Sequence, residues 1–453
     1  MSILRKFIDR LSDYSDREFF IDDSGSTTYP ELGRELERAR QELEASKIRS
    51  GEFVLLVGDF NVPCIAMLLA LAERETVFAP LTVESERKLS SVLPLLKPNV
   101  RVEWNSGKNS GEGFRISRLR DERSLVTESL EVSGAGFVVF TSGSTGTPKA
   151  IVHHFLPLLE KFSKSRRAYR AIPFLLFDHM GGINTVLSVL SSGGCIVSTR
   201  VRTCSEVCRA IAKHRVTLLP TTPTFLNLLL LSEEYRNHDL SSLELITYGT
   251  EVMSEVVLRR LVEVFPKVSF KQTYGMSEFG VIGSVSKEKG STWLKVGGDG
   301  IESKVVDGIL WIKAKSQMCG YFSFSDGAPS WNLAKDDWFC TGDMVEEEGE
   351  YLRFLGRQCD IINVSGLKVY PMEVEECLLE NSLVNDVAVR GVPHLLTGKV
   401  IEARIVLAVP SAPDEARKTL TKHCWERLER YKVPTKFVFV EQLEISDRFK
   451  KRR

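Results

Sequence analysis

The sequence predicts an α/β protein with a large N-terminal domain of helix-covered β-sheets and a small α+β C-terminal domain. Three observations support this fold class. Short apolar runs alternate with helical stretches through the first part of the chain, the pattern becomes rich in strands and turns after about residue 300, and Gly356 opens a differently patterned segment. With 453 residues, of which 43% are apolar, the chain can bury several large cores.

Helix and strand alternate from the start of the chain. A charged amphipathic helix that ends near Ile48 is followed by an apolar strand at 53–57, and an apolar helix at 63–71 is followed by a buried strand at 76–80. Such alternation predicts a parallel sheet covered by helices, with ligands at the carboxyl ends of the strands. The polar, Gly/Ser-rich segment 105–113 indicates a surface loop.

The second half of the N-terminal domain continues this pattern and then changes. Its strands are expected at 136–140, 194–198, 216–219 and 245–248. A strand at 351–355 is expected just before Gly356, and a short charged helix at 373–379 and a long strand at 400–409 belong to the last part. We therefore expect an N-terminal domain at 1–356, a hinge at 357–360 and a C-terminal domain at 361–453.

Composition excludes several classes of function. The 60 basic residues balance the 60 acidic ones, which gives no support for nucleic acid as a partner. No run approaches the roughly 18 apolar residues of a membrane span, so stable membrane insertion is not expected, and the first residues lack an apolar signal core, which predicts a cytoplasmic protein. Nine scattered cysteines fit reduced thiols, and Cys204 and Cys208 are interpreted as buried small side chains instead of metal ligands.

A loop rich in glycine and hydroxyl groups follows the apolar strand at 136–140. Gly143 and Gly146 allow tight turns that bring backbone N–H groups near an anion, and Lys149 adds a positive charge. Side-chain hydroxyls come from Thr141, Ser142, Ser144, Thr145 and Thr147. The segment predicts a cradle for a polyphosphate, although its spacing differs from the Walker A pattern, so kinase and GTPase mechanics do not follow.

The order of residues in this loop, 140–149, resembles the phosphate-binding motif of the adenylate-forming superfamily. That superfamily includes acyl-CoA and aryl-CoA synthetases, adenylation domains of peptide synthetases, and firefly luciferase. The resemblance implies that ATP is bound, with Mg²⁺ held by Glu278 and Thr145 and with Lys149 serving the leaving pyrophosphate.

A second motif, Tyr274-Gly275-Met276-Ser277-Glu278, offers an aromatic ring, a turn, a hydroxyl and a carboxylate. Beside a triphosphate, Glu278 is a suitable oxygen ligand for magnesium, Ser277 can bond a phosphate oxygen, and Tyr274 can cover a flat base. The segment from Tyr248 to Glu251, with Gly249 and Thr250, resembles the adenine-contacting loop of the family. There Gly249 would let a ring approach the backbone, next to the substrate pocket.

Further motifs extend the resemblance to the last residues. Asp343, in a Thr-Gly-Asp turn, and Arg357, in a Gly-Arg pair, match the family residues that bind the ribose hydroxyls. In relatives, the loop that here contains Ser365, Gly366 and Lys368 lines the pantetheine tunnel.

The final basic segment occupies the place of the motif whose lysine bridges the reacting carboxylate and the α-phosphate. Lys450 aligns best with that lysine, and Lys451 is the competitor. Phe449 replaces the usual glycine before it. At the hinge, Cys359 stands where relatives carry Asp or Lys, and Asp360 follows; either can be the swivel, because a hinge needs permissive torsions more than a particular side chain.

The resemblance implies an ATP-dependent enzyme that activates an aryl or fatty acid to acyl-AMP, releases pyrophosphate and transfers the acyl group to coenzyme A, with a small domain that moves between the two steps. Transfer to the phosphopantetheine of an acyl carrier protein is the alternative, and a catalytically silent nucleotide-binding relative is a third. A luciferase-like oxygenase would share these motifs.

The segment at 175–182 gives an indication of the class of acid that is activated. Asp178 facing the pocket would suit an α-ammonium group, whereas His179 facing it favours an aryl or fatty acid, which is the interpretation preferred here. His153 and His154 are expected on a helix face.

Overall fold

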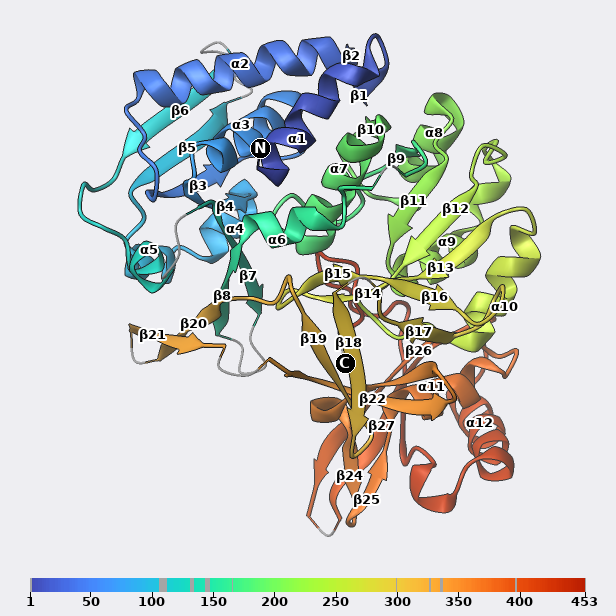
Figure 1. Cartoon of the computed structure of the whole chain (residues 1–453). Helices are drawn as coiled ribbons and strands as arrows, with labels where there is room; N and C mark the ends of the chain where they lie inside the picture. The colour runs from blue at the N-terminus through green and yellow to red at the C-terminus, as the bar shows by residue number, and fades with distance from the viewer. Residues whose placement is uncertain are drawn as a thin grey trace.

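The computed structural model describes residues 2–105, 112–130, 134–142, 147–164, 166–298, 300–325, 327–334, 337–395 and 397–452. Helices and strands are mixed throughout, and two large sheets lie side by side above a third sheet and a smaller C-terminal part (Figure 1). This arrangement confirms the predicted α/β fold class.

The first large sheet has eight strands in the order β21-β20-β8-β7-β4-β3-β5-β6. Its centre is parallel, whereas β7 and β8 form an antiparallel pair that places Thr141 opposite Lys149. The strands are β3 (Phe53–Val57), β4 (Val77–Leu81), β5 (Val100–Asn105), β6 (Gly113–Arg118), β7 (Gly136–Ser142), β8 (Pro148–His154), β20 (Gly320–Ser325) and β21 (Ala328–Leu333).

The second large sheet has seven strands in the order β13-β12-β11-β9-β10-β1-β2. All neighbours are parallel except β1 and β2, so the carboxyl ends of β11, β12 and β13 meet at one edge. The strands are β1 (Glu18–Asp22), β2 (Gly25–Thr28), β9 (Arg170–Ala171), β10 (Cys195–Val197), β11 (Leu218–Thr221), β12 (Leu245–Tyr248) and β13 (Ser269–Gln272).

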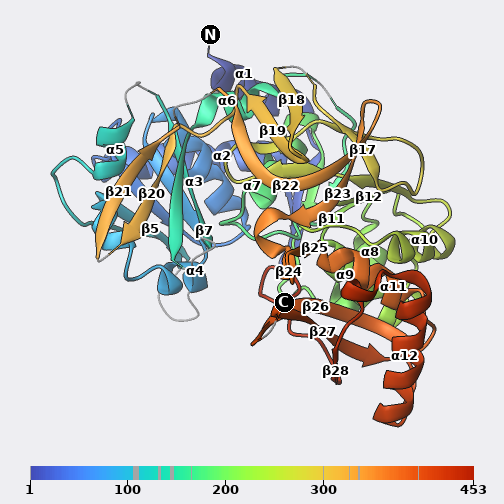
Figure 2. The same ribbon diagram turned by 90° about the horizontal axis from the view of Figure 1, so that it is seen from below.

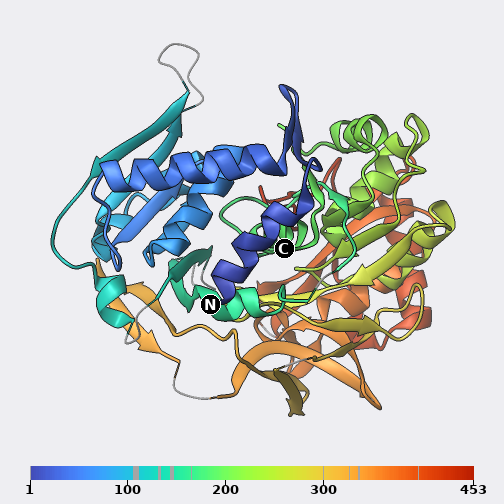
Figure 3. The same cartoon turned by 45° about the horizontal axis from the view of Figure 1, so that its top comes forward.

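Helices fill the space between the two sheets and cover their outer faces (Figures 1 and 3). Buried side chains of α2, α3 and α7 share one core with strands of both sheets. Helix α2 begins at a capping box between Thr28 and Glu31, and α3 is apolar on all sides because it lies inside this core. The helices are α1 (Ile3–Asp9), α2 (Tyr29–Ala45), α3 (Val62–Glu73), α4 (Val83–Lys88), α5 (Leu125–Ser129), α6 (Phe155–Glu160), α7 (Met180–Ser192), α8 (Cys204–His214), α9 (Pro223–Ser232) and α10 (Glu255–Val264).

A six-stranded antiparallel sheet follows, in the order β16-β17-β23-β22-β19-β18, and a two-stranded hairpin, β14 (Tyr274–Met276) with β15 (Gly280–Ile282), leads into it. Its longest pair, β22 and β23, places Asp343 opposite Arg357. The strands are β16 (Ser284–Ser286), β17 (Trp293–Val296), β18 (Ile301–Val306), β19 (Ile309–Ala314), β22 (Phe339–Glu348) and β23 (Tyr351–Arg357).

The last part of the chain lies below the three sheets (Figure 2). After the short 3₁₀ turn η4 (Gln358–Asp360), a five-stranded sheet forms around the long strand β27, and side chains of α11 share a core with the second large sheet. The elements are β24 (Ile362–Val364), β25 (Leu367–Val369), α11 (Pro371–Leu379), β26 (Val384–His394), β27 (Gly398–Leu407), α12 (Pro413–Arg427) and β28 (Lys436–Phe439).

Most sequence-based assignments agree with these elements to within two or three residues. The prediction for His153 and His154 is wrong: both end strand β8, and α6 begins only at Phe155. The predicted loop at 105–113 lies mostly outside the described residues, and Gly113 begins β6. None of the helices in the described segments combines the length and apolar character needed to cross a bilayer.

One glycine in α7 gives a test of the packing. A Cβ atom on Gly182 would lie against the backbone carbonyl oxygens of Leu175 and Leu176, closer than a van der Waals contact. Gly182→Ala should therefore lower the free energy of unfolding by about 2 kcal/mol or more. Urea denaturation would measure it.

Gly33, exposed on α2 with open space around its Cα, is the matched control. Gly33→Ala should leave stability unchanged or raise it by about 0.5–1 kcal/mol. Equal effects of the two substitutions would contradict the tight packing of α7.

Candidate active site

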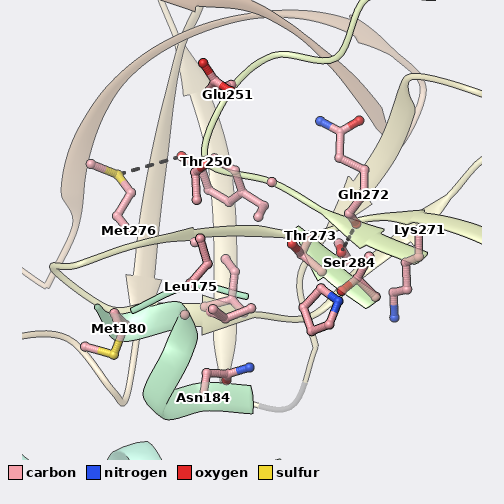
Figure 4. A pocket seen from close by; sticks show the side chains of 18 of the residues that line it. Leu175, Met180, Asn184, Thr250, Glu251, Lys271, Gln272, Thr273, Met276 and Ser284 are labelled. Carbon is pink, nitrogen blue, oxygen red and sulfur yellow. Dashed lines mark hydrogen bonds between the residues drawn. The ribbon is translucent and has the colours of Figure 1, made fainter. Parts of the chain in front are cut away.

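A cavity of about 1550 Å³ lies at the carboxyl ends of β11, β12 and β13. The hairpin β14–β15, the start of α7, strands β22 and β23 and the last residues of the chain complete its walls. Figure 4 shows part of it: Thr250, Glu251 and Met276 on one side, and Met180 and Asn184 of α7 on the other. Ligands are expected at this edge of a parallel sheet.

The buried carboxylate of Asp343 borders the cavity. Asp343 pairs through Oδ1 with the Arg357 guanidinium at 2.8 Å, and the Tyr274 hydroxyl donates to Oδ2 at 2.6 Å. Burial raises the pKa of Asp343, and the Arg357 charge and the Tyr274 hydrogen bond oppose that rise. The sequence prediction that paired Asp343 with Arg357 thus matches their positions, because the register of β22 and β23 places them opposite each other.

Tyr274 is held on two sides. Its ring stacks on Phe354, with 4.7 Å between ring centroids and a 29° interplanar angle, while its hydroxyl bonds Asp343. The ring also borders the cavity. The stacking on Phe354 leaves only the remaining ring surface for a base.

Gly249, expected to let a ring approach the backbone, and Gly275, expected to form a turn, are both required by the packing of the protein itself. A Cβ atom on Gly249 would lie 2.7 Å from both the carbonyl and the hydroxyl oxygen of Thr273, and one on Gly275 would lie 2.6 Å from the carbonyl oxygen of Gly280. Thr250, next to Gly249, has a left-handed backbone with φ of 72°. All three residues line the cavity.

Glu278 lies in the same cavity, beside the motif residue Ser277. Burial raises the pKa of Glu278, and the charges of Arg357 and Lys149 counteract it. The Lys149 ammonium lies 4.7 Å from the centroid of the Tyr321 ring. The backbone carbonyl of Ser277 accepts a hydrogen bond from Nε2 of buried His153 at 2.6 Å.

The phosphate loop is only partly described. Thr141 lines the cavity at the end of β7, and Ser142 is that strand's last residue. Gly143, Ser144, Thr145 and Gly146, including the predicted metal ligand Thr145, lie outside the described residues.

The two candidate tail lysines both border the cavity, and the contacts of the Lys451 ammonium distinguish them. Lys450 lines the cavity, where burial lowers its pKa; Glu251 and Asp343 oppose that shift, whereas Arg357 adds to it. The Lys451 ammonium instead binds the Asp386 carboxylate at 2.5 Å and the Val387 carbonyl at 3.1 Å. The geometry therefore favours Lys450 as the cation available to a ligand.

The tail around Lys450 is fixed to the N-terminal part by several contacts that the sequence did not indicate. The Phe449 ring lies 4.9 Å from Phe174 and 5.6 Å from Phe225, measured between centroids, and the Phe449 carbonyl accepts from the Thr222 hydroxyl at 2.9 Å. Arg448 pairs with Asp178 at 3.3 Å, Asp447 pairs with Lys88, and the Lys451 N–H donates to Glu251 at 3.0 Å.

The ion pair between Arg448 and Asp178 also distinguishes Asp178 from His179, the two residues considered for contact with the acid. Asp178 is buried against Arg448, whereas His179 lines the cavity and caps α7, where its Nδ1 accepts from the Gly181 N–H at 3.0 Å. Burial, with Arg448 and Lys450 nearby, lowers the pKa of His179 to about 3, so its imidazole is neutral at pH 7.

The predicted tunnel residues lie apart from these groups. Ser365 and Gly366 form the turn between β24 and β25 with φ of 52° and 88°, and they and Lys368 are exposed outside the cavity. At the predicted hinge, exposed Cys359 contacts Asp360, Sγ to Oδ1, at 3.7 Å, and Asp360 borders the cavity.

Comparison with known proteins identifies the class. Residues 99–322 match the family described as AMP-binding enzyme, and residues 373–450 match the AMP-binding enzyme C-terminal domain. The chain therefore belongs to the AMP-binding, adenylate-forming family, as the sequence motifs predicted.

Individual relatives narrow the comparison. The chain is 28% identical to a long-chain-fatty-acid–CoA ligase of Salmonella typhimurium over 74% of its own length and 62% of the relative's. It is 30% identical to an indoleacetate–CoA ligase of Aromatoleum aromaticum over 68% of its length and 63% of the relative's. The chain thus spans about three fifths of the length of these relatives. An anthranilate CoA ligase solved with anthranoyl-AMP shares the fold, with a TM-score of 0.79, 20% identity and coverage of 100% of this chain and 95% of that one.

Two buried histidines predict a loss of stability in acid. Burial lowers the pKa of His153 to about 4 and that of His179 to about 3, from an ordinary 6.5. The unfolded chain binds these protons more readily, so this contribution is complete above about pH 6.5 and is lost as pH falls toward 4, by up to about 1.4 kcal/mol per pH unit for each histidine.

His153→Gln should flatten this dependence, as measured by urea denaturation between pH 7.5 and 5, because one of the two histidines is removed. The exposed His394 provides the control His394→Gln, which should keep the wild-type slope. An unchanged slope in His153→Gln would show that other groups bind the protons.

Proposed function

We propose that this protein uses ATP to convert a carboxylic acid to acyl-AMP, with release of pyrophosphate, and then transfers the acyl group to the thiol of coenzyme A. One observation carries the proposal. A single cavity brings the buried Asp343, with its partners Arg357 and Tyr274, together with Glu278 and Lys450. Family membership and the CoA ligases among the relatives support the same reaction.

The Asp343 carboxylate suits a ribose. Each carboxylate oxygen can accept more than one hydrogen bond, and Arg357 and Tyr274 take up one position on each. Two ribose hydroxyls can therefore donate to Asp343 while both protein partners stay in place. The nucleotide is then oriented before the reaction begins.

Lys450 supplies charge where the reaction needs it. A carboxylate that attacks the α-phosphorus of ATP meets another anion, and a cation between them lowers the repulsion. Burial disfavours the ammonium form of Lys450 in the free protein. Phosphate oxygens would restore it, because a nearby negative charge stabilises the protonated amine.

The donors around the phosphates fit Mg²⁺. This ion binds through one or two carboxylates and completes its shell with water and substrate phosphates, and Glu278 offers a buried carboxylate in the cavity. Glu278, with Thr145 as its proposed companion, would hold the ion, which neutralises charge on the leaving phosphates. Lys149 and the hydroxyls of the loop that begins at Thr141 would bind the pyrophosphate.

The acid is proposed to be an aryl or fatty acid. Asp178 is buried, pairs with Arg448 and is not part of the cavity lining, so it is not available to an α-ammonium group, while neutral His179 lines the cavity. This arrangement favours the acids of the CoA ligases over amino acids.

The second step is proposed to use the C-terminal part, residues 361–453, as a mobile domain on an N-terminal domain of residues 1–356. The turn that holds Cys359 and Asp360 would be the hinge, and the exposed hairpin with Ser365, Gly366 and Lys368 would receive the pantetheine arm of coenzyme A or of a carrier protein.

Nine free thiols fit a reducing compartment such as the cytoplasm.

Exchange of labelled pyrophosphate into ATP, dependent on an added acid, tests the first step. A panel of aryl, fatty and amino acids should show exchange with aryl or fatty acids. Lys450→Ala should lower the exchange rate by about 100-fold or more, the scale of removing one charge-stabilising donor from a transition state.

Lys451→Ala is the matched control. It should keep most of the exchange and instead lower the melting temperature, because Asp386 loses its partner. The reverse pattern would assign the role to Lys451, and no exchange with any acid would refute the proposed function.

Lys368→Ala tests the second step. It should leave pyrophosphate exchange unchanged and raise the KM for coenzyme A several-fold, since one phosphate contact of an exposed lysine contributes about 1 kcal/mol. Thioester formation followed by chromatography, with coenzyme A and with a carrier protein as acceptors, measures the effect and identifies the acceptor. Equal loss of both half-reactions would contradict a role confined to the thiol.

A further inference from the structure

A group of cations lines the cavity apart from Lys450. Lys161 follows α6, Arg166 lies in the segment that leads to β9, and Lys271 is on the edge strand β13, and all three border the cavity. Arg166 donates to the Lys161 carbonyl at 3.0 Å and its charge lowers the pKa of Lys161 and of Lys271, whereas the charges that shift the pKa of Lys450 include Glu251, Arg357 and Asp343. The two sets of charges therefore occupy different parts of the cavity.

Within the described residues, no ion pair joins Lys161, Arg166 or Lys271 to a carboxylate. The Lys161 ammonium is largely buried and donates to the Val281 carbonyl at 2.7 Å, and burial together with Arg166 lowers its pKa to about 7. Glu160, the residue before Lys161, also borders the cavity, but its side chain is exposed to solvent. Cations that lower each other's pKa favour an anion between them.

Register fixes the direction of Lys271. It stands beside Thr247 of β12, which stands beside Pro220 of β11, so these three side chains share the face of the sheet that lines the cavity. In Figure 4 the Lys271 side chain points away from Glu251 and Gln272, toward the level of Asn184. A ligand that extends from Lys450 and Asp343 toward Lys271 would therefore lie along the face of the sheet formed by Pro220, Thr247 and Lys271.

The wall between the two charged ends is partly polar. Asn184 and Ser188 lie one turn apart on α7, and Thr247 faces the cavity from β12, among apolar neighbours such as Met180 and Leu245. A purely alkyl chain would leave these polar groups without hydrogen bonds, whereas an acid with a polar far end would not.

We propose that the acid carries a second carboxylate, and that Lys161, Arg166 and Lys271 bind it while the first carboxylate is activated beside Lys450. This rests on the proposed function and narrows its substrate to aryl or aliphatic dicarboxylic acids. The three residues determine specificity and take no part in the bond changes.

Pyrophosphate exchange with matched pairs of acids tests this. Each straight-chain acid is compared with its ω-carboxyl counterpart of equal length, and phenylacetate with its para-carboxymethyl derivative. The dicarboxylic acid of the preferred length should have a kcat/KM at least about tenfold higher, equivalent to one partly solvated charge interaction.

Lys271→Met and Arg166→Gln should each remove most of this preference, through a higher KM for the diacid, and leave the monoacids unchanged. Both side chains are exposed, so neither change removes a core contact. Lys271→Glu should shift the preference toward acids with a terminal ammonium. Lys267→Met, at an exposed position outside the cavity lining, is the control and should behave as wild type.

The outcomes separate the two proposals. Exchange with monoacids that equals or exceeds exchange with diacids overturns the second-carboxylate site and leaves the ligase function intact. Variants that lower exchange with both members of a pair equally also overturn it. No exchange with any acid refutes the ligase function, and the second-carboxylate site with it.

Discussion

The Asp343 carboxylate is the constraint on which the site depends. A carboxylate this deeply buried is unfavourable unless its oxygens are satisfied, and here a guanidinium from β23 and a phenol from β14 satisfy them. Because those partners come from two different sheets, the same contacts fix the hairpin β14–β15 against the six-stranded sheet. The positions of Glu278 and of the cavity wall beside Gly275 follow from that hairpin.

Much of the fold was readable from the sequence because burial dictates pattern. Strand β3 is apolar at every position and buried on both faces, and α3 is apolar all round because it lies between sheets. The helix predicted at His153 was wrong. Strand β8 runs through His153 to His154, and His154 is also the N-cap of α6. The His153 side chain is stabilised by the carbonyl of Ser277, which is remote in sequence, and no local pattern records such a contact.

The site was predictable where two motif residues lie opposite each other on paired strands, as Asp343 and Arg357 do. It was not predictable where tertiary contacts decide between neighbours. Asp178 and His179 are adjacent in sequence, and only the position of Arg448 shows which one faces the cavity. In the same way, Asp386 engages Lys451 and leaves Lys450 to the site. The cluster of Lys161, Arg166 and Lys271 carries no motif, because its members come from two segments more than 100 residues apart, the connection after α6 and strand β13.

Phe449 has a consequence for the movement proposed for the C-terminal part. The Phe449 ring packs against the adjoining rings of Phe174 and Phe225 and is partly buried there, so a motion that withdrew Lys450 would expose apolar surface to water, at about 1 kcal/mol. Such a difference corresponds to about a fivefold bias in a two-state equilibrium. In a relative with glycine at this position the two states would be closer in population. For the movement proposed for the C-terminal part, this contact would favour the state in which Lys450 lies at the cavity and would slow departure of the lysine relative to its return.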